Sequence, residues 1–332
     1  MRKLFLLVLV FALIVTPIFA AGQSETKEKE GKIVLKLGDT QAEEHPQTQS
    51  YYFFAKRLAE LTDGRVEVQV FPNSALGNHR DMLEGIKMET LQMTKCMATD
   101  LSAYFPKIQV FGLPYMFDST EHMLRVVDGE VGEYFNNEIF PAEDFIALAW
   151  FDAGSRSIYN KTRPIYSTAD TQGLLLRVPE NNIYMSSMAA FGATGTPMPM
   201  GDIYTALQTG VIDGAENAFA VYDGMKHFEV AKYFSYTQHI MTPDVIIMKR
   251  SYLQSLPQDI QDAIWQAADE MEQEERRLWI EADMEFYERL KAAGVQFNDV
   301  DKSTFQTAAK SVWESYTEVI GEDLINKVQS YK

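Results

Sequence analysis

The feature that most constrains the fold is a helical stretch at residues 257–293, which contains no internal glycine. Pro257 suits the first turn of a helix, and Gly294 ends the stretch. At about 1.5 Å per residue, such a helix is longer than about 50 Å, which exceeds the width of one domain of ordinary size. We therefore expect a long helix that contacts two domains.

The first part of the chain has the pattern of a strand, a helix and a second strand. Residues 32–37 are a short apolar run, residues 47–61 have helical spacing, and residues 65–71 alternate apolar and polar side chains. This order predicts a βαβ unit and an α/β fold. Further helices are predicted at 78–87, 119–135, 181–191, 202–208 and 310–327, and further strands at 91–96, 144–151, 174–178, 211–215 and 245–248.

The composition limits the possible partners. The chain has 332 residues, enough for two domains, and its 46% hydrophobic residues support a packed core. The net charge of −17 argues against nucleic acid and against an anionic membrane surface. It does not exclude a small anion, because two local arginines can bind a carboxylate within an acidic protein. The single cysteine, Cys96, excludes an intramolecular disulfide and is expected to be a buried structural thiol.

The N-terminus has the pattern of a signal peptide, which we assign to residues 1–21. Arg2 and Lys3 precede an apolar run, and a signal peptidase site is expected near Ala20 and Ala21. The run is short for a transmembrane helix, although an uncleaved anchor is the alternative. Residues 22–31 are polar and are expected to form a disordered linker. These features predict a protein exported to the periplasm.

The sequence lacks the common signatures of nucleotide, metal and nucleophile sites. It has no Walker loop, no HExxH, no GxSxG, and no GxGxxG after a strand. We predict no cofactor, no metal and no catalytic residue.

The most informative stretch is residues 173–217, which we interpret as the floor of a site for a small carboxylate. Arg177 follows an apolar run and is fixed by the valine and proline after it, and Arg156 is expected in a turn at residues 152–160. An arginine offers a planar fork that matches a carboxylate. Glu216 and Asn217 follow an Asp-Gly pair, and the glycine in this predicted strand indicates a close approach of the backbone.

The runs GLLLRVP, GATGTPM, YTALQTGVIDGAEN and HFEVAKYFSYTQH carry a family resemblance. In this order, with FDAGSRSIYN and FGLPYMF before them, the chain resembles the solute-binding proteins of TRAP transporters, the DctP family. The resemblance implies an α/β fold, a two-lobe periplasmic-binding-protein clamshell with a long helix spanning both lobes. It implies lobe I at 32–153 plus 243–282 and lobe II at 154–242 plus 283–332. It further implies a monomer that delivers its solute to the small and large subunits of a TRAP membrane permease.

The same resemblance implies roles for residues of the predicted site. Arg177 matches the arginine that pairs with the substrate carboxylate, Arg156 a second family arginine, and Asn217 the asparagine beside the ligand. Glu216 matches a glutamate that supports Arg156 or Arg177 rather than contacting ligand.

The subgroup that the chain resembles binds hexuronates and similar sugar acids. In that subgroup Gln41 and His45 would line the hydroxyl end, with Lys95 as a basic residue; the other expected pocket residues are Phe219, Tyr222 and His79. His79 and the Ala218-Phe219 pair depart from the pattern of these relatives, and Met97 counts against sialic acid. The expected ligand is a hexuronate such as glucuronate or galacturonate, with a dicarboxylate, a 2-oxo acid or an aldonate as alternatives.

Two other functions remain open at the level of the sequence. One is a secreted enzyme that acts on acidic sugars with Glu216 as the base. The other is a sensor that presents its closed state to a signalling receptor instead of a permease.

Overall fold

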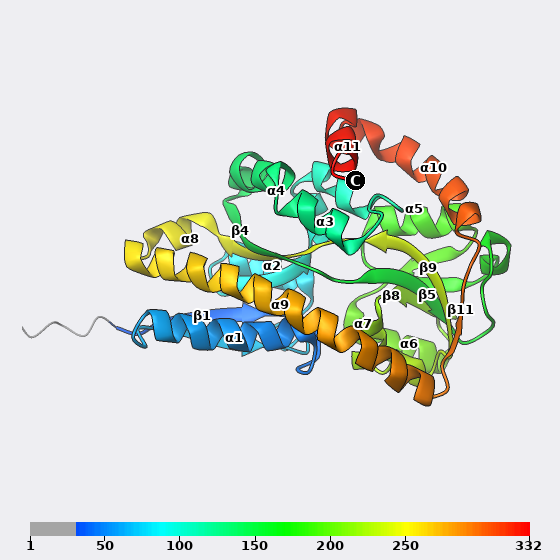
Figure 1. Ribbon diagram of the computed structural model, residues 1–332, viewed down its shortest axis with the longest axis horizontal. Coiled ribbons are helices and arrows are strands. Elements are labelled where there is room, and N and C mark those ends of the chain that lie inside the picture. The colour runs from blue at the N-terminus through cyan, green and yellow to red at the C-terminus, as the bar shows by residue number, and fades with distance from the viewer. Residues whose placement is uncertain (1–30) are drawn as a thin grey trace, which may run out of the picture. The chain divides into compact units, whose positions relative to one another are not determined.

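The computed structural model describes residues 31–332, apart from the side chains of residues 283 and 284. The predicted signal peptide and nearly all of the predicted linker lie outside the described residues. Residues 32–332 form one unit that holds two β-sheets flanked by helices (Figure 1). This arrangement confirms the prediction of an α/β fold.

The first sheet contains the predicted βαβ unit. Its strands, in spatial order, are β2 (Val66–Phe71), β1 (Ile33–Gly38), β3 (Met93–Met97), β10 (Asp244–Lys249) and β4 (Phe145–Phe151). β1 is parallel to β2 and β3, and Ile33 lies opposite Val66. β10 is antiparallel to both β3 and β4, so it returns into this sheet from a distant part of the sequence.

The second sheet carries the stretch that the sequence singled out. Its strands, in spatial order, are β11 (Gln296–Asn298), β9 (Tyr233–Met241), β5 (Ser155–Asn160), β8 (Gly214–Asn217), β6 (Leu175–Val178) and β7 (Thr194–Pro197). A Cβ atom on Gly214 would lie 2.3 Å from the Tyr159 carbonyl oxygen of β5. The close backbone approach predicted for this glycine is therefore confirmed, and β8 begins at Gly214 rather than at residue 211.

Arg156 lies in strand β5. The sequence pattern had indicated a turn at this position, and that prediction is wrong. The glycine and serines around it give no strand signal of their own. β5 is fixed instead by antiparallel pairing with β8 on one side and β9 on the other. Tertiary pairing thus overrides local preference at this position.

The helices include two short ones that were not predicted, at 219–224 and 250–255, and two of the predicted helices need correction. The helices are α1 (Pro46–Leu61), α2 (His79–Lys87), α3 (Thr120–Val127), α4 (Glu130–Tyr134), α5 (Asn182–Phe191), α6 (Ile203–Thr209), α7 (Phe219–Gly224), α8 (Arg250–Ser255), α9 (Gln258–Ala292), α10 (Lys302–Ile320) and α11 (Glu322–Gln329). The helix predicted at 119–135 is divided into α3 and α4. The helix predicted at 310–327 is divided at Gly321, whose φ of 93° does not continue a helix.

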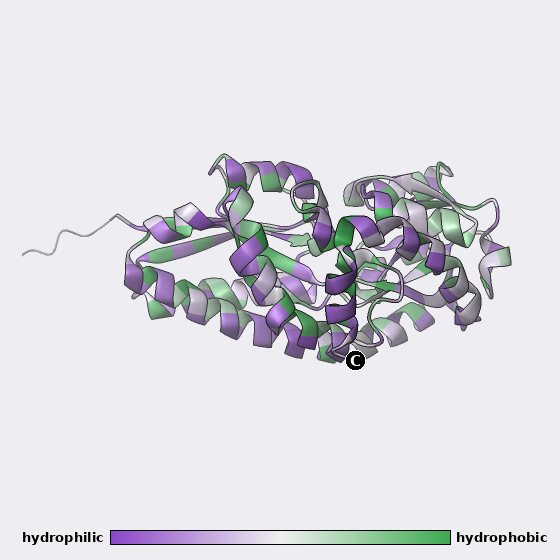
Figure 2. Ribbon diagram, turned by 90° about the horizontal axis from the view of Figure 1, so that it is seen from above, coloured by the Kyte–Doolittle hydropathy of each residue, from purple (hydrophilic) through white to green (hydrophobic). Residues whose placement is uncertain are grey.

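Helix α9 extends beside both sheets, as its length predicted (Figure 1). Its first part packs on α1 and β4, and Arg57 of α1 forms an ion pair with Glu270 at 2.5 Å. Its last part packs on α7, where Arg289 forms an ion pair with Asp223 at 2.5 Å. Hydrophilic and hydrophobic residues alternate along α9 in Figure 2, which is the pattern of a helix with one buried face.

The chain passes between the sheets at three places. Residues 152–154 join β4 to β5, residues 242–243 join β9 to β10, and α9 passes along both. The C-terminal helices contact both halves as well. α10 packs on α5 beside the second sheet. On the other side, Trp313 of α10 donates to the Pro114 carbonyl, and His122 of α3 bonds the Val328 carbonyl of α11. The predicted lobe boundaries stay a prediction, and these contacts connect residues 302–332 to a segment that we had placed in lobe I.

Strands β4, β8 and β10 are buried on both faces. All residues of β4 and β8 are buried, as are all residues of β10 except Lys249. Within residues 31–332, no helix combines the length and the apolar character that a membrane span requires.

Candidate functional site

A cavity of about 360 Å³ is lined by side chains from both sheets. Lys95 of β3 and Asp244 of β10 come from the first sheet, while Arg156 of β5, Arg177 of β6 and Asn217 of β8 come from the second. Most of these side chains stand within strands of paired, buried backbone. Their positions are therefore fixed before any ligand arrives.

Arg177 is a buried cation that forms no ion pair within residues 31–332. Its side chain is 3% exposed, and its Nε and Nη2 donate to the Met198 carbonyl oxygen at 2.8 and 2.5 Å. Its Nη1 has no hydrogen-bond partner among the described residues. Burial, together with the charge of Arg156, lowers the pKa of Arg177 to about 10, so the guanidinium is still charged at neutral pH.

Arg156 has the opposite situation, because a carboxylate holds its fork. Its Nε and Nη2 donate to the Glu216 side chain at 2.6 and 2.8 Å, and Nη2 also donates to the Glu216 carbonyl. Burial opposes the charge of Arg156, but Glu216 more than offsets this and raises the pKa above its ordinary value. Glu216 is fully buried and does not line the cavity. It therefore supports Arg156, one of the two roles that the resemblance implied, and this geometry gives no support to a role as a base.

Asn217 lines the cavity and has an unsatisfied donor. Its Oδ1 accepts from Arg156 Nη1 at 3.0 Å and from the Ala218 backbone N–H at 2.9 Å. Both partners are donors, so the orientation of the amide is fixed and the other atom must be the NH₂ group. This Nδ2 has no acceptor within residues 31–332. Arg177 Nη1 and Asn217 Nδ2 are thus unsatisfied N–H donors, and each could donate to an oxygen of a ligand.

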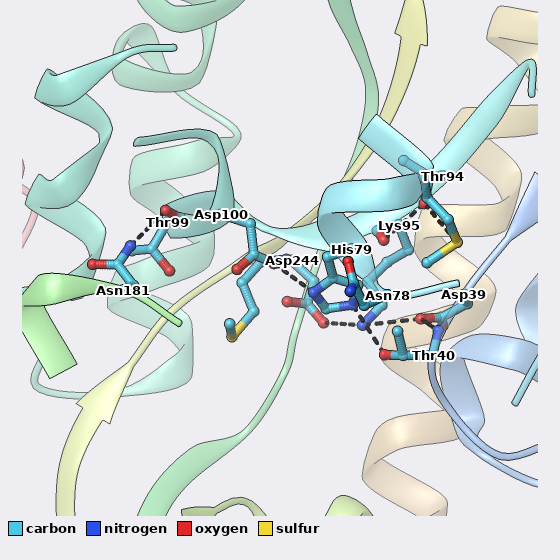
Figure 3. Close-up of polar contacts among 12 residues, drawn as sticks. Asp39, Thr40, Asn78, His79, Thr94, Lys95, Thr99, Asp100, Asn181 and Asp244 are labelled. Atoms are coloured by element: carbon cyan, nitrogen blue, oxygen red, sulfur yellow. Dashed lines mark hydrogen bonds and ion pairs between the residues drawn. The ribbon is translucent and has the colours of Figure 1, made fainter. Parts of the chain in front are cut away.

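Lys95 lies between two carboxylates of the first sheet (Figure 3). Its Nζ is 3.2 Å from Asp39 Oδ1 and 3.2 Å from Asp244 Oδ2, and the side chain is 1% exposed. Burial opposes the ammonium charge, but Asp244 and Asp39 raise the pKa of Lys95 above its ordinary value. Lys95 lines the cavity as expected, but its charge is already compensated within the protein.

His79 belongs to a short chain of polar contacts on the same wall of the cavity (Figure 3). Its Nδ1 is 2.5 Å from Asp100 Oδ2, and its Nε2 is 2.9 Å from the Thr40 hydroxyl. A carboxylate only accepts, so Nδ1 carries a proton. The acidic residue that relatives are expected to carry at position 79 is replaced here by a histidine that holds Asp100.

Gln41 and His45 also line the cavity. His45 caps α1, because its Nδ1 accepts from the Gln47 N–H at 3.3 Å, which leaves the proton on Nε2. Burial lowers the pKa of His45 to about 3, so the ring is neutral. Neither His45 Nε2 nor Gln41 Oε1 has a partner in the described part of the chain.

Phe219 and Tyr222 do not line the cavity and are corrected here. Both belong to the hydrophobic cluster behind the second sheet, with Phe219 partly and Tyr222 fully buried. The Tyr222 hydroxyl is occupied by the Ala231 carbonyl at 2.5 Å. They follow Asn217 in sequence, but α7 turns their rings toward Phe234 and away from the ligand space.

Several lining residues were missed by the sequence analysis. They are Gln47, Asp100, Asn181, Trp279 and Asp244. Asn181 caps α5 and also donates to the Thr99 carbonyl at 2.7 Å, and an asparagine before a helix was a readable capping signal. Asp244 opens an apolar strand, and nothing local distinguishes it from a surface aspartate.

The described residues include no group of three or more histidine, cysteine, aspartate or glutamate side chains that could hold a metal ion. Cys96 is buried, as expected, and burial raises the pKa of its thiol well above the ordinary value. It does not line the cavity.

The family model of the bacterial extracellular solute-binding proteins, family 7 (DctP), matches residues 37–319. The chain belongs to this family. The prediction of a DctP solute-binding protein is therefore confirmed, and so is the two-lobe fold class that the resemblance implied.

Solved structures of TRAP periplasmic solute-binding proteins are similar to this DctP chain over most of its length. One from Chromohalobacter salexigens, with bound D-glucuronate, has a TM-score of 0.86 at 33% identity and covers 90% of this chain and 100% of its own. One from Roseobacter denitrificans, with bound L-galactonate, has a TM-score of 0.85 at 33% identity over 91% and 99%. One from Sulfurospirillum deleyianum, with bound succinate, has a TM-score of 0.86 at 29% identity over 91% and 100%.

Proposed function

We propose that this DctP protein captures a small sugar acid, most specifically a hexuronate such as glucuronate or galacturonate, and delivers it to the two membrane subunits of a TRAP permease. The observation that carries the proposal is Arg177, a buried guanidinium whose Nη1 is unsatisfied and which forms no ion pair in the part of the chain that the structure describes. A ligand carboxylate supplies the missing charge. Two of the similar proteins hold sugar acids, which supports this ligand class.

The roles of the side chains follow from their contacts. Arg177 binds the carboxylate, and Asn217 Nδ2 donates to the same end of the ligand. Arg156 stays paired with Glu216 and holds Asn217 in place through Nη1. His45, Gln41 and the Lys95 cluster face the hydroxyl end. The protein is expected to act in the periplasm, with the signal peptide removed near Ala20.

The test is calorimetry of the mature protein with glucuronate and galacturonate, using Arg177→Lys and Arg177→Ala. Lysine keeps the charge but cannot reproduce the fork, so we expect affinity to fall at least about 100-fold in Arg177→Lys and to be lost in Arg177→Ala. Arg163→Lys is a matched control, because the Arg163 side chain donates to the backbone carbonyls of Asp170 and Gln172 and lies outside the cavity lining. Wild-type affinity in Arg177→Lys would refute the assignment.

The delivery step is tested separately from binding. Uptake of labelled hexuronate into membrane vesicles that contain the permease should require the protein and its ligand. Uptake that proceeds without it would support the signalling alternative. Recovery of unchanged ligand after long incubation with the protein would remove the enzyme alternative.

A further inference from the structure

On the first-sheet side of the cavity, the fully buried charged groups are mostly carboxylates, whereas Arg80 and Glu84 of the same lining are exposed to solvent. One buried ammonium, Lys95, serves both Asp39 and Asp244, which are 0% and 2% exposed. Within the described residues, His79 is the only basic side chain that bonds the nearby Asp100. The second sheet presents the reverse situation, because Arg177 forms no ion pair among the described residues and Arg156 is balanced by Glu216. The two sides of the cavity therefore differ in electrostatic character.

Asp244 lines the cavity and has an unsatisfied acceptor. Its Oδ2 receives both Lys95 Nζ, at 3.2 Å, and Gln47 Nε2, at 2.9 Å. Its Oδ1 is buried and has no donor in the part of the chain that the structure describes. Burial raises the pKa of Asp244 and Lys95 opposes this shift, so the site already disfavours negative charge.

Gln47 presents a second acceptor of the same kind. Its Nε2 donates to the Asp152 carbonyl and to Asp244, both of which only accept here, so the orientation of the amide is fixed. Its Oε1 therefore is an oxygen, and it has no donor among residues 31–332. The ligand groups that meet Asp244 and Gln47 must be hydrogen-bond donors.

We infer that the cavity accepts a polyhydroxylated acid with one carboxylate and rejects a diacid of the same length. This inference rests on the proposed function, since it takes Arg177 as the anchor of that single carboxylate. A hydroxyl can donate to Asp244 Oδ1 while it accepts from the third N–H of Lys95. A carboxylate at that place only accepts, leaves Asp244 and Gln47 unsatisfied, and adds charge beside two buried carboxylates. The relative with bound succinate shows that membership of the family does not by itself exclude a diacid as ligand.

The first experiment is calorimetry with monoacids and the diacids that share their carbon chain. The monoacids are glucuronate, gluconate, galacturonate and galactonate, and the diacids are glucarate and galactarate. We expect the best monoacid to bind at least about 100-fold more tightly than its diacid, a difference of about 2.7 kcal/mol. A diacid that binds as tightly as the best monoacid would overturn the inference and leave the proposed function intact. If none of the acids binds, the proposed function fails and the inference fails with it.

Variants test which groups cause the discrimination. Asp244→Asn and Asp39→Asn each remove one buried negative charge at nearly constant shape. Each should lower the ratio of monoacid affinity to diacid affinity at least about tenfold. Two variants are used so that the test survives if one does not fold. Glu44→Gln is the matched control, because Glu44 is exposed and lies outside the cavity lining, so solvent screens its charge. An unchanged ratio in a folded Asp244→Asn or Asp39→Asn protein would refute the role of this cluster.

Discussion

Arg156 and Arg177 lie on strands that flank β8, yet their side chains are in different electrostatic states. Arg156 is bound to a fully buried Glu216, whereas Arg177 has only the Met198 carbonyl and an unsatisfied Nη1 within the described residues. Sequence alone treats the two as similar candidates for a ligand carboxylate. The contacts of the two guanidinium groups distinguish them: Glu216 holds Arg156, whereas Arg177 keeps an unsatisfied Nη1 in the described part of the chain.

This difference predicts opposite effects of two matched substitutions on the ligand-free protein. Arg156→Met leaves Glu216 as an uncompensated buried charge and should lower the free energy of unfolding by about 3–5 kcal/mol. Burial lowers the pKa of Arg177 and so destabilises its charged form by roughly 3 kcal/mol, at about 1.4 kcal/mol per pKa unit. Arg177→Met removes this destabilised cation, so the free energy of unfolding should stay the same or rise. Urea unfolding without ligand measures both values. Equal losses in the two variants would show that Arg177 has a structural partner at its site.

At the scale of the element, α1 begins at a residue that also faces the ligand space. His45 caps the helix through Nδ1 and lies against Trp279, with the ring centroids 5.5 Å apart. An asparagine at this position would be an equally good cap, because its amide oxygen can accept from the same N–H. His45→Asn therefore separates the titration of this side chain from its capping contact.

The titration of His45 predicts an acid-sensitive helix end. Its folded pKa of about 3 lies below the ordinary 6.5, because burial disfavours the charged ring. Between these values the unfolded chain binds a proton that the folded chain does not, so stability falls as the pH decreases from 6.5 toward 3. Relative to His45→Asn, the wild type should lose about 1.4 kcal/mol per pH unit in this window. Urea midpoints measured from pH 7 to pH 4 for both proteins check this, and parallel curves would contradict it.

At the scale of the whole molecule, ligand capture requires contacts that connect the two sides of the cavity. Asn181, the cap of α5, donates to the Thr99 carbonyl at 2.7 Å (Figure 3). It also donates to the Ser102 hydroxyl at 3.1 Å, in the same segment after β3. The cap itself is made by the other amide atom, Oδ1, which accepts from Ile183 N–H. A substitution at Asn181 can therefore remove the bridge to Thr99 and Ser102 while keeping the cap of α5.

Asn181→Ser should keep the cap of α5 and lose the bridge to Thr99, because serine is also a good cap but is shorter. If the bridge stabilises the closed form, hexuronate affinity should fall about tenfold, chiefly through faster dissociation. The radius of gyration without ligand, measured by small-angle scattering, should not decrease. Stopped-flow dissociation rates equal to those of the wild type would contradict this role. Asn181→Ala is the comparison that loses both the bridge and the cap.

The sequence by itself determined the elements whose signal is local. The long helix α9 followed from a helical stretch without glycine, the βαβ unit from its apolar periodicities, and the family from motifs such as GLLLRVP and GAEN. The close approach at Gly214 also followed, since a glycine inside a strand often marks a place where another backbone comes near. These features depend on residues that are near one another in the chain.

The tertiary structure alone decided which charges are compensated and which side chains reach the ligand space. Lys95 is balanced by Asp39 and Asp244, which are distant in sequence, and the pairing of β3 with β1 on one side and with β10 on the other brings them together. The strand that holds Arg156 and the rotation of Phe219 away from the cavity depend in the same way on strands that pair across the sheet. A sequence pattern specifies the kind of side chain at a position, but its electrostatic partner is specified only when the sheets are assembled.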